Sequence, residues 1–235
     1  MMKFLIILLC MPIATFASGE LRLDKAPDRS NDMAALQNGA KVFINYCLNC
    51  HSASFMRYNR MKDIGLTEDL IKKNFPLMAD KVGEPMRNTM HRDEGKIWFG
   101  VAPPDLTIIE RARASEFGSG SDWLYTFMRT FYRDENRPIS WNNKILENAG
   151  MPHVLWELQG IQEMGEDHNL KLVVPGTMKP DEYDSMIADL VAYLKYMGEP
   201  VAEFRKQLGV IVVIFLSIAL VFAYALKREY WKDIH

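Results

Sequence analysis

A long uncharged stretch near the C-terminal end limits the folds open to this chain. Residues 207–226 are 20 consecutive positions without Asp, Glu, Lys or Arg. At 1.5 Å per residue, a helix of this length spans roughly 30 Å, the thickness of a bilayer's hydrocarbon core. Basic residues flank both ends, and Tyr224, Tyr230 and Trp231 stand where interfacial aromatic residues lie. We therefore predict one C-terminal transmembrane helix over 207–226, not a buried core helix.

The N-terminal end carries a second apolar segment that is too short to span a bilayer. Lys3 precedes an apolar run over residues 4–13, and small residues follow it. This order of charge, apolar run and small residues is typical of a secretory signal peptide, here residues 1–17 with cleavage after Ala17. A lipoprotein signal lipidated at Cys10 is disfavoured, because two bulky leucines directly precede that cysteine.

The two ends together predict the topology of the chain. The signal exports residues 18–206, the helix over 207–226 stops transfer, and residues 227–235 form a cytoplasmic tail. We expect a single-pass protein of the cell inner membrane with its domain on the periplasmic side. The whole chain has a net charge of −2 and no basic run, which disfavours nucleic-acid binding. The exported part is slightly acidic, which suits either a basic partner or a solvated surface.

Cys47-Leu48-Asn49-Cys50-His51 is the strongest chemical signal in the sequence. Two thiols three residues apart, followed at once by His, are the pattern of covalent c-type haem attachment. Two thioethers would fix the porphyrin, and His51 would place an imidazole under the iron. We therefore expect one covalent haem c, held by Cys47, Cys50 and His51.

Two other uses of paired cysteines fit less well. A zinc site would need a second ligand pair, and the only other cysteine is Cys10, within the predicted signal. A thioredoxin-like redox pair would not require His51 and would follow a strand. Haem attachment remains the interpretation that uses all three residues.

The exported part has a mainly helical pattern at its two ends. Asp32 is a candidate N-cap for a helix with apolar residues at Leu36, Ala40, Phe43 and Cys47. A second amphipathic helix is predicted over Asp184–Met197, ending before Gly198. Shorter helices are predicted over Asp69–Lys73, Ile108–Glu116 and Asp122–Tyr132, whereas residues 134–182 are expected to be mostly loops. Gly39 and Tyr193 resemble the pair at the helix crossing of small soluble cytochromes c.

The second axial ligand of the haem iron is not decided by spacing alone. Met151 stands between Gly150 and Pro152, which favours a loop, and His153 follows two residues later. A Met–His pair would give a higher reduction potential than two histidines. The residues themselves leave Met151 and His153 as equal candidates.

Taken together, the chain resembles the cytochrome c1 family of the respiratory bc1 complex. The resemblance rests on the haem motif with Arg57-Tyr58 after it, on Ala102-Pro103-Pro104-Asp105-Leu106, on Arg111-Ala112-Arg113, on Gly150-Met151-Pro152 and on the closing helix with its membrane anchor. It implies a mainly α fold, a class I cytochrome c-like haem domain with long loop insertions and one C-terminal transmembrane helix. It also implies Met151 as the axial ligand, although Pro152 follows it more closely than in the family's pattern.

The resemblance further implies Arg113 as a haem-propionate ligand and Trp123 at the position of its tyrosine partner. The implied function is electron transfer: haem c accepts one electron from a Rieske iron–sulfur protein and passes it to a soluble or membrane-bound cytochrome c. Cytochrome b and the Rieske protein would be partner subunits in a dimeric complex, and the chain would do no bond chemistry of its own. Two alternatives are a free-standing membrane-anchored electron carrier, and a haem enzyme or gas sensor with an open iron position.

Overall fold

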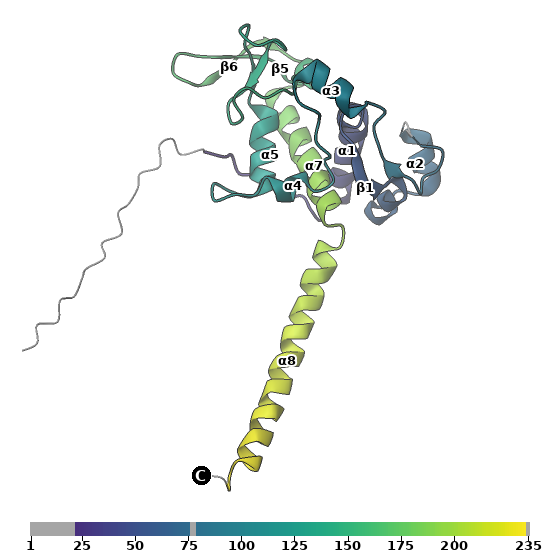
Figure 1. Ribbon diagram of the computed structural model, residues 1–235, viewed down its shortest axis with the longest axis vertical. Coiled ribbons are helices and arrows are strands. Elements are labelled where there is room, and N and C mark those ends of the chain that lie inside the picture. The colour runs from purple at the N-terminus through teal and green to yellow at the C-terminus, as the bar shows by residue number, and fades with distance from the viewer. Residues whose placement is uncertain (1–21, 76–78, 234–235) are drawn as a thin grey trace, which may run out of the picture.

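The computed structural model describes residues 22–75 and 79–233, and the predicted signal peptide lies outside them. The described chain is a helical head from which one long helix departs (Figure 1). The mainly α fold with a C-terminal apolar helix is confirmed. The helices of the head are α1 (Met33–Val42), α2 (Glu68–Asn74), α3 (Arg92–Phe99), α4 (Ile109–Ala112), α5 (Gly120–Arg129), α6 (Trp156–Gln159) and α7 (Pro180–Gly198).

The core of the head is the crossing of α1 and α7. Asp32 caps α1 by accepting from the backbone N–H groups of Ala34 and Ala35, as predicted. A Cβ added to Gly39 would lie 2.1 Å from the carbonyl oxygen of Asp189 on α7. Only glycine therefore allows this approach, and Tyr193 packs beside it, 5.8 Å from Phe43 between ring centroids. The predicted Gly39–Tyr193 crossing is confirmed.

The helix boundaries depart from the sequence predictions in ways that local contacts explain. A turn of π-helix, η1 (Phe43–Cys47), follows α1 and carries the first cysteine. Helix α7 starts earlier than predicted, with Pro180 at its first position and Glu182 bonded back to the N–H of Lys179. Helix α4 is shorter than predicted, because Ser115 and Gly118 pair in a turn.

Residues 134–182 hold more regular structure than predicted. Among the described residues, strands form antiparallel pairs: β1 (Ala53–Arg57) with β2 (Pro85–Met86), β3 (Phe131–Arg133) with β4 (Trp141–Asn143), and β5 (Gly160–Met164) with β6 (Leu170–Pro175). The loop prediction was wrong for β4, α6 and the β5–β6 hairpin. Residues 58–64 form a 3-10 helix, η2 (Tyr58–Ile64).

The long helix α8 (Ala202–Tyr230) includes the predicted 207–226 span. Within the described residues it is the one helix long and apolar enough to cross a membrane, and none of its apolar window is buried against the head. Its side chains from Leu208 to Leu226 are almost all exposed. A helix with an apolar surface on every side and no protein cover fits a single-pass membrane anchor.

Candidate haem site

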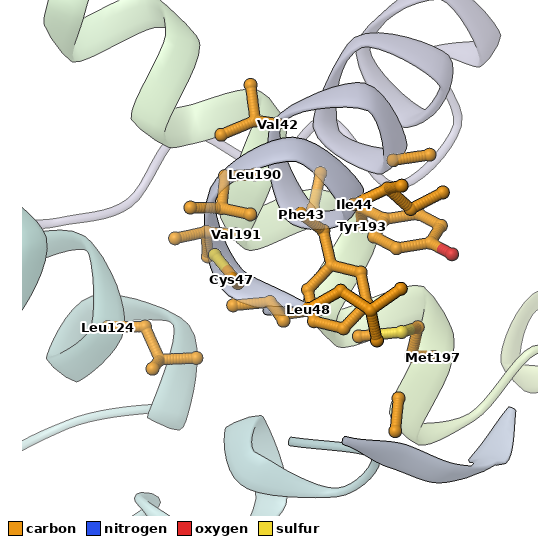
Figure 2. Packing of buried hydrophobic residues seen from close by; sticks show 14 of the residues in the cluster. Val42, Phe43, Ile44, Cys47, Leu48, Leu124, Leu190, Val191, Tyr193 and Met197 are labelled. Carbon is orange, nitrogen blue, oxygen red and sulfur yellow. The ribbon is translucent and has the colours of Figure 1, made fainter. Parts of the chain in front are cut away.

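Cys47, Cys50 and His51 open onto one apolar cavity of about 430 Å³. Cys47 ends the π-helical turn, beside Leu190 and Val191 of α7 and across from Leu124 of α5 (Figure 2). The cavity is lined mainly by apolar side chains of α5, α7 and two loops: Tyr46, Phe99, Val101, Ala102, Pro103, Pro104, Leu106, Ile109, Trp123, Leu124, Phe127, Met128, Leu146, Ala149, Met151, Val154, Leu190 and Leu194.

His51 is held in one orientation by the Pro103-Pro104 loop. Its Nδ1 lies 2.8 Å from the carbonyl oxygen of Pro104. Since a carbonyl only accepts, Nδ1 carries the proton and donates, which leaves the Nε2 lone pair free to bind a metal. Burial lowers the pKa of His51. The hydrogen bond to the Pro104 carbonyl and the negative charge of Asp105 act in the opposite direction but are weaker, so the ring is neutral at neutral pH.

The loop that holds His51 is itself braced by Asp105. Its carboxylate accepts from the N–H of Ser54 at 2.8 Å and from the N–H and hydroxyl of Thr107 at 2.8 and 2.6 Å. Burial opposes ionisation, but these hydrogen bonds prevail and lower the pKa of Asp105. The Pro-Pro-Asp-Leu segment thus has a clear role: Pro104 orients the imidazole and Asp105 fixes the segment to β1.

The two thiols face apolar surroundings. Cys47 is buried, and burial, with a smaller contribution from Cys50, raises the pKa of its thiol to about 12. Burial also raises the pKa of Cys50, which is partly exposed. Both thiols therefore stay protonated at neutral pH, whereas zinc binding and disulfide exchange use thiolates.

The structure separates the two candidate axial ligands. Met151 lines the cavity and His153 does not. His153 is buried between Phe131, stacked at 5.0 Å between ring centroids, and Trp141, edge-on at 5.1 Å. Position 150 requires glycine, because an added Cβ would lie only 2.7 Å from the carbonyl oxygen of Phe99. The Gly150-Met151 step thus packs closely on the cavity rim.

Arg113 and Trp123 also meet at this cavity, in a geometry that the sequence did not indicate. The Arg113 guanidinium lies 4.3 Å from the centroid of the Trp123 ring, and that ring also stacks on Phe127 with 4.8 Å between ring centroids. The indole thus contacts Arg113 through its ring face. All six site residues predicted from the sequence line one cavity: Cys47, Cys50, His51, Arg113, Trp123 and Met151.

Sequence reasoning missed much of the apolar wall. Phe127 and Met128 on α5, Leu190 and Leu194 on α7, and Tyr46 beside the first cysteine all line the cavity. Amphipathic spacing on α5 and α7 marks these positions as buried, but it does not distinguish a cavity wall from an ordinary core. Asn88 was also missed. Its amide donates to the carbonyl of Cys50 and its carbonyl accepts from the Ser52 hydroxyl, so it fixes the backbone beside His51.

The comparisons with known proteins agree with this geometry. The model of the protein family described as "Cytochrome C1 family" matches residues 24–234 of this chain. The chain belongs to the cytochrome c1 family. A cytochrome c1 from Allochromatium vinosum is 42% identical over 97% of this chain and 96% of its own length, and one from Rhodospirillum rubrum is 27% identical over 86% and 83%. A protein named ammonia monooxygenase gamma subunit, from Nitrosomonas europaea, is 48% identical over 100% of this chain and 99% of its own length.

Membership of the cytochrome c1 family makes this chain an electron-transfer haem subunit of the bc1 type, with haem c as its cofactor. The residues present fit that group. The cavity is apolar and of the size of small-molecule sites, two thiols stand at its edge, and an oriented imidazole and a thioether line it. Arg113 supplies a positive charge at the same cavity, as a group with carboxylate substituents requires.

Proposed function

We propose that this chain relays single electrons from a Rieske iron–sulfur subunit to a soluble or membrane-bound cytochrome c. One observation carries the proposal: Cys47, Cys50, His51 and Met151 line the same apolar cavity, with Arg113 and Trp123 on its wall. The two thiols would attach a haem covalently, His51 and Met151 would bind its iron, and Arg113 would pair with a propionate.

Each of these residues has a distinct task in the proposed relay. Bound haem c supplies reversible one-electron chemistry at its iron. Cys47 and Cys50 hold the group through thioethers, which prevents its loss from an exported protein. The Pro104 carbonyl holds Nδ1 of His51, so its Nε2 would bind the iron, and the thioether of Met151 would favour the reduced state. If His51 and Met151 both bind the iron, no open position is left for a substrate or gas, which would disfavour a haem enzyme or gas sensor.

The cavity wall sets the electrostatic environment of the relay. Apolar side chains from α5 and α7 exclude water, which disfavours the extra positive charge of the oxidised state. Arg113, held over Trp123, would pair with a propionate and favour the reduced state further. The protein therefore tunes a potential and does no bond chemistry.

The same proposal includes the setting of the chain. Residues 18–206 form the haem domain on the periplasmic side, after removal of residues 1–17, and residues 227–235 end in the cytoplasm. In this proposal the span over 207–226 anchors the haem domain in the membrane beside cytochrome b and the Rieske subunit, in a complex that contains two copies of each. The apolar helix α8 supports the single membrane crossing.

An optical experiment on membranes tests the proposed donor. A reduced quinol analogue is added with and without an inhibitor of the quinol site on the Rieske side, and the c-type absorption band is followed. We expect rapid reduction that the inhibitor suppresses. Reduction at the same rate with inhibitor would show that another donor reduces this haem. Absence of a c-type band would show that the chain does not bind haem c.

The Nitrosomonas relative supports a second candidate function, because its name places it with a monooxygenase. In that case the chain would be a membrane-anchored electron carrier serving an oxygen-activating enzyme rather than a quinol-oxidising complex. Affinity purification of the tagged protein from mild detergent distinguishes the two. Recovery of cytochrome b and the Rieske protein in equal amounts supports the relay, whereas recovery of monooxygenase subunits without them supports the carrier.

A further inference from the structure

The end of the head from which α8 departs exposes large apolar side chains. Phe55 on β1 is 87% exposed, and Ile108, just before α4, is 57% exposed. Both β1 and α4 lie at this end of the head in Figure 1. Neither side chain belongs to the core or to the haem cavity.

Phe55 and Ile108 are tied directly to the joint between α7 and α8. The N–H of Phe55 donates to the Thr107 hydroxyl at 3.3 Å, and Ile108 is the next residue. A Cβ added to Gly198, the last residue of α7, would lie 3.7 Å from the Thr107 carbonyl oxygen. The backbone that carries the two apolar side chains therefore lies beside the joint.

The length of α8 places that joint at the surface of the membrane. Helix α8 begins at Ala202, and its first five residues, 202–206, precede the uncharged span that begins at Gln207. They amount to about 7.5 Å of helix, comparable with the interfacial layer of roughly 5–8 Å on each side of the hydrocarbon core. Groups packed on the joint are thus at the depth of the lipid headgroups.

The charged groups at the joint suit that depth. The carboxylate of Glu199 is shared by Arg111 of α4, at 3.5 Å, and Arg205 of α8, at 2.5 Å. Both arginines are more than half exposed. Each guanidinium has five N–H donors, so donors remain for phosphate oxygens beside the bond to Glu199.

We propose that this end of the head rests on the bilayer, with Phe55 and Ile108 inserted at the boundary between headgroups and acyl chains and with Arg111 and Arg205 among the lipid phosphates. The occupant is lipid because α8 enters the bilayer at this joint, which brings the exposed apolar and basic groups beside it to the depth of the membrane interface. The proposal depends on α8 spanning the membrane and not on the electron donor or acceptor.

This contact gives α4 a second role. Ile109 at its start and Arg113 directly after it line the haem cavity, while Arg111 pairs with Glu199 at the joint and Ile108, just before the helix, is exposed. A helix of one turn thus connects the cavity wall to the lipid surface. The contact sets the height of the haem cavity above the membrane, which fixes the distance that a membrane-bound electron donor must cross.

Spin labelling of the full-length protein in its own membranes tests the contact. Phe55→Cys and Ile108→Cys are labelled separately, and collision with oxygen, which enters lipid, is compared with collision with a water-soluble nickel chelate. The matched control is Val173→Cys on β6, an apolar position that is 47% exposed at the opposite end of the head. Covalent haem and an unchanged reduction potential establish that each variant is folded.

We expect a several-fold higher ratio of oxygen to nickel accessibility at positions 55 and 108 than at position 173. A nickel-accessible label at both positions would place this face in water and overturn the proposal. Labels shielded from both reagents would show that a protein subunit covers the face, which also overturns it. If one of the two variants does not fold with covalent haem, the accessibility ratio of the other still tests the contact, because positions 55 and 108 lie in different segments of the chain.

Discussion

Met151 and Met128 both line the haem cavity, yet only Met151 lies in a loop with a glycine before it. Met128 belongs to α5, is 6% exposed, and its carbonyl accepts from the Tyr183 hydroxyl. We expect Met151→Leu to lower the reduction potential, and Met151→His to do so within the range of about 0.8 V that axial ligands span. Met128→Leu, of similar volume, should leave the potential unchanged. Spectroscopic redox titration of the three variants measures these potentials. An unaltered potential in Met151→Leu would exclude Met151 as the ligand.

Arg113 and Trp123 allow a sharper test at the same scale, because the structure assigns the indole ring face a role. Trp123→Phe keeps a ring under Arg113 but removes the N–H, whereas Trp123→Leu removes the ring and about 0.5–1 kcal/mol of cation–π attraction. We expect Arg113→Gln to lower the reduction potential, Trp123→Leu to lower it less, and Trp123→Phe to leave it nearly unchanged. If the reduction potential fell as much in Trp123→Phe as in Trp123→Leu, the indole N–H and not the ring face would be the group that supports the potential.

At the scale of elements, the approach of α1 to α7 depends on Gly39. The added methyl of Gly39→Ala would overlap backbone atoms of Asp189, so the helices must move apart. We expect a loss of about 3 kcal/mol of unfolding free energy, at the upper end for overpacked cores. Gly83→Ala is the matched control, since a Cβ there meets nothing within 4 Å. Thermal unfolding followed by circular dichroism measures both, and equal midpoints for the two variants would contradict the role of the crossing.

The N-terminal segment before α1 is held to α5 by Asp122, which gives the fold a defined acid sensitivity. Its buried carboxylate accepts from the N–H of Ala26 at 2.8 Å and pairs with Lys25 at 3.1 Å. Burial opposes ionisation, but these bonds and those from Ser119 lower the pKa of Asp122 below 3.8. A depressed carboxyl pKa stabilises the fold fully above the unfolded-state value of about 3.9, and this contribution is lost as pH falls through the folded value.

Asp122→Asn should therefore lower the unfolding free energy by about 2 kcal/mol at neutral pH, the worth of a charged buried hydrogen bond. The difference from the wild type should shrink as the pH falls from about 3.9 through the lower pKa of folded Asp122, because the carboxyl group is then neutralised in the native state as well. Asp93→Asn, at a carboxylate whose side chain is 92% exposed, is the control and should have little effect. Urea unfolding from pH 3 to pH 7 gives the comparison, and a difference that stays constant across this range would argue against the assigned pKa.

The elements that could be predicted from the sequence are those whose signals lie within a few neighbouring residues. Asp32 and the apolar spacing after it specify α1, and the end of α7 is marked by Gly198, because caps and helical period are local. The β5–β6 hairpin escaped prediction because its stability comes from pairing across the turn, for example Ile161 with Val174. Six site residues were predicted, but the choice of Met151 over His153 needed either the family resemblance or the packing of His153 between Phe131 and Trp141.

At the scale of the whole molecule, the head and the membrane helix are energetically separable. All residues that line the haem cavity lie between Tyr46 and Leu194, and α8 leaves its own apolar surface uncovered by the head. Arg205 of α8 pairs with Glu199 at the end of α7, and Glu199 keeps Arg111 as a partner without it. The core formed by α1, α5 and α7 therefore does not need the anchor.

A chain that ends after Val201 should thus be exported as a water-soluble haem protein with the reduction potential of the full-length form. Gel filtration without detergent and a redox titration of both forms measure this, with the full-length protein in detergent as the reference. Equal potentials would show that the cavity alone sets the potential, since every ligand and wall residue is retained. A shifted potential or loss of haem would mean that α8 or the lipid beneath the head shapes the cavity through α4, because that helix carries Arg111 at the joint and is followed directly by Arg113 at the cavity wall.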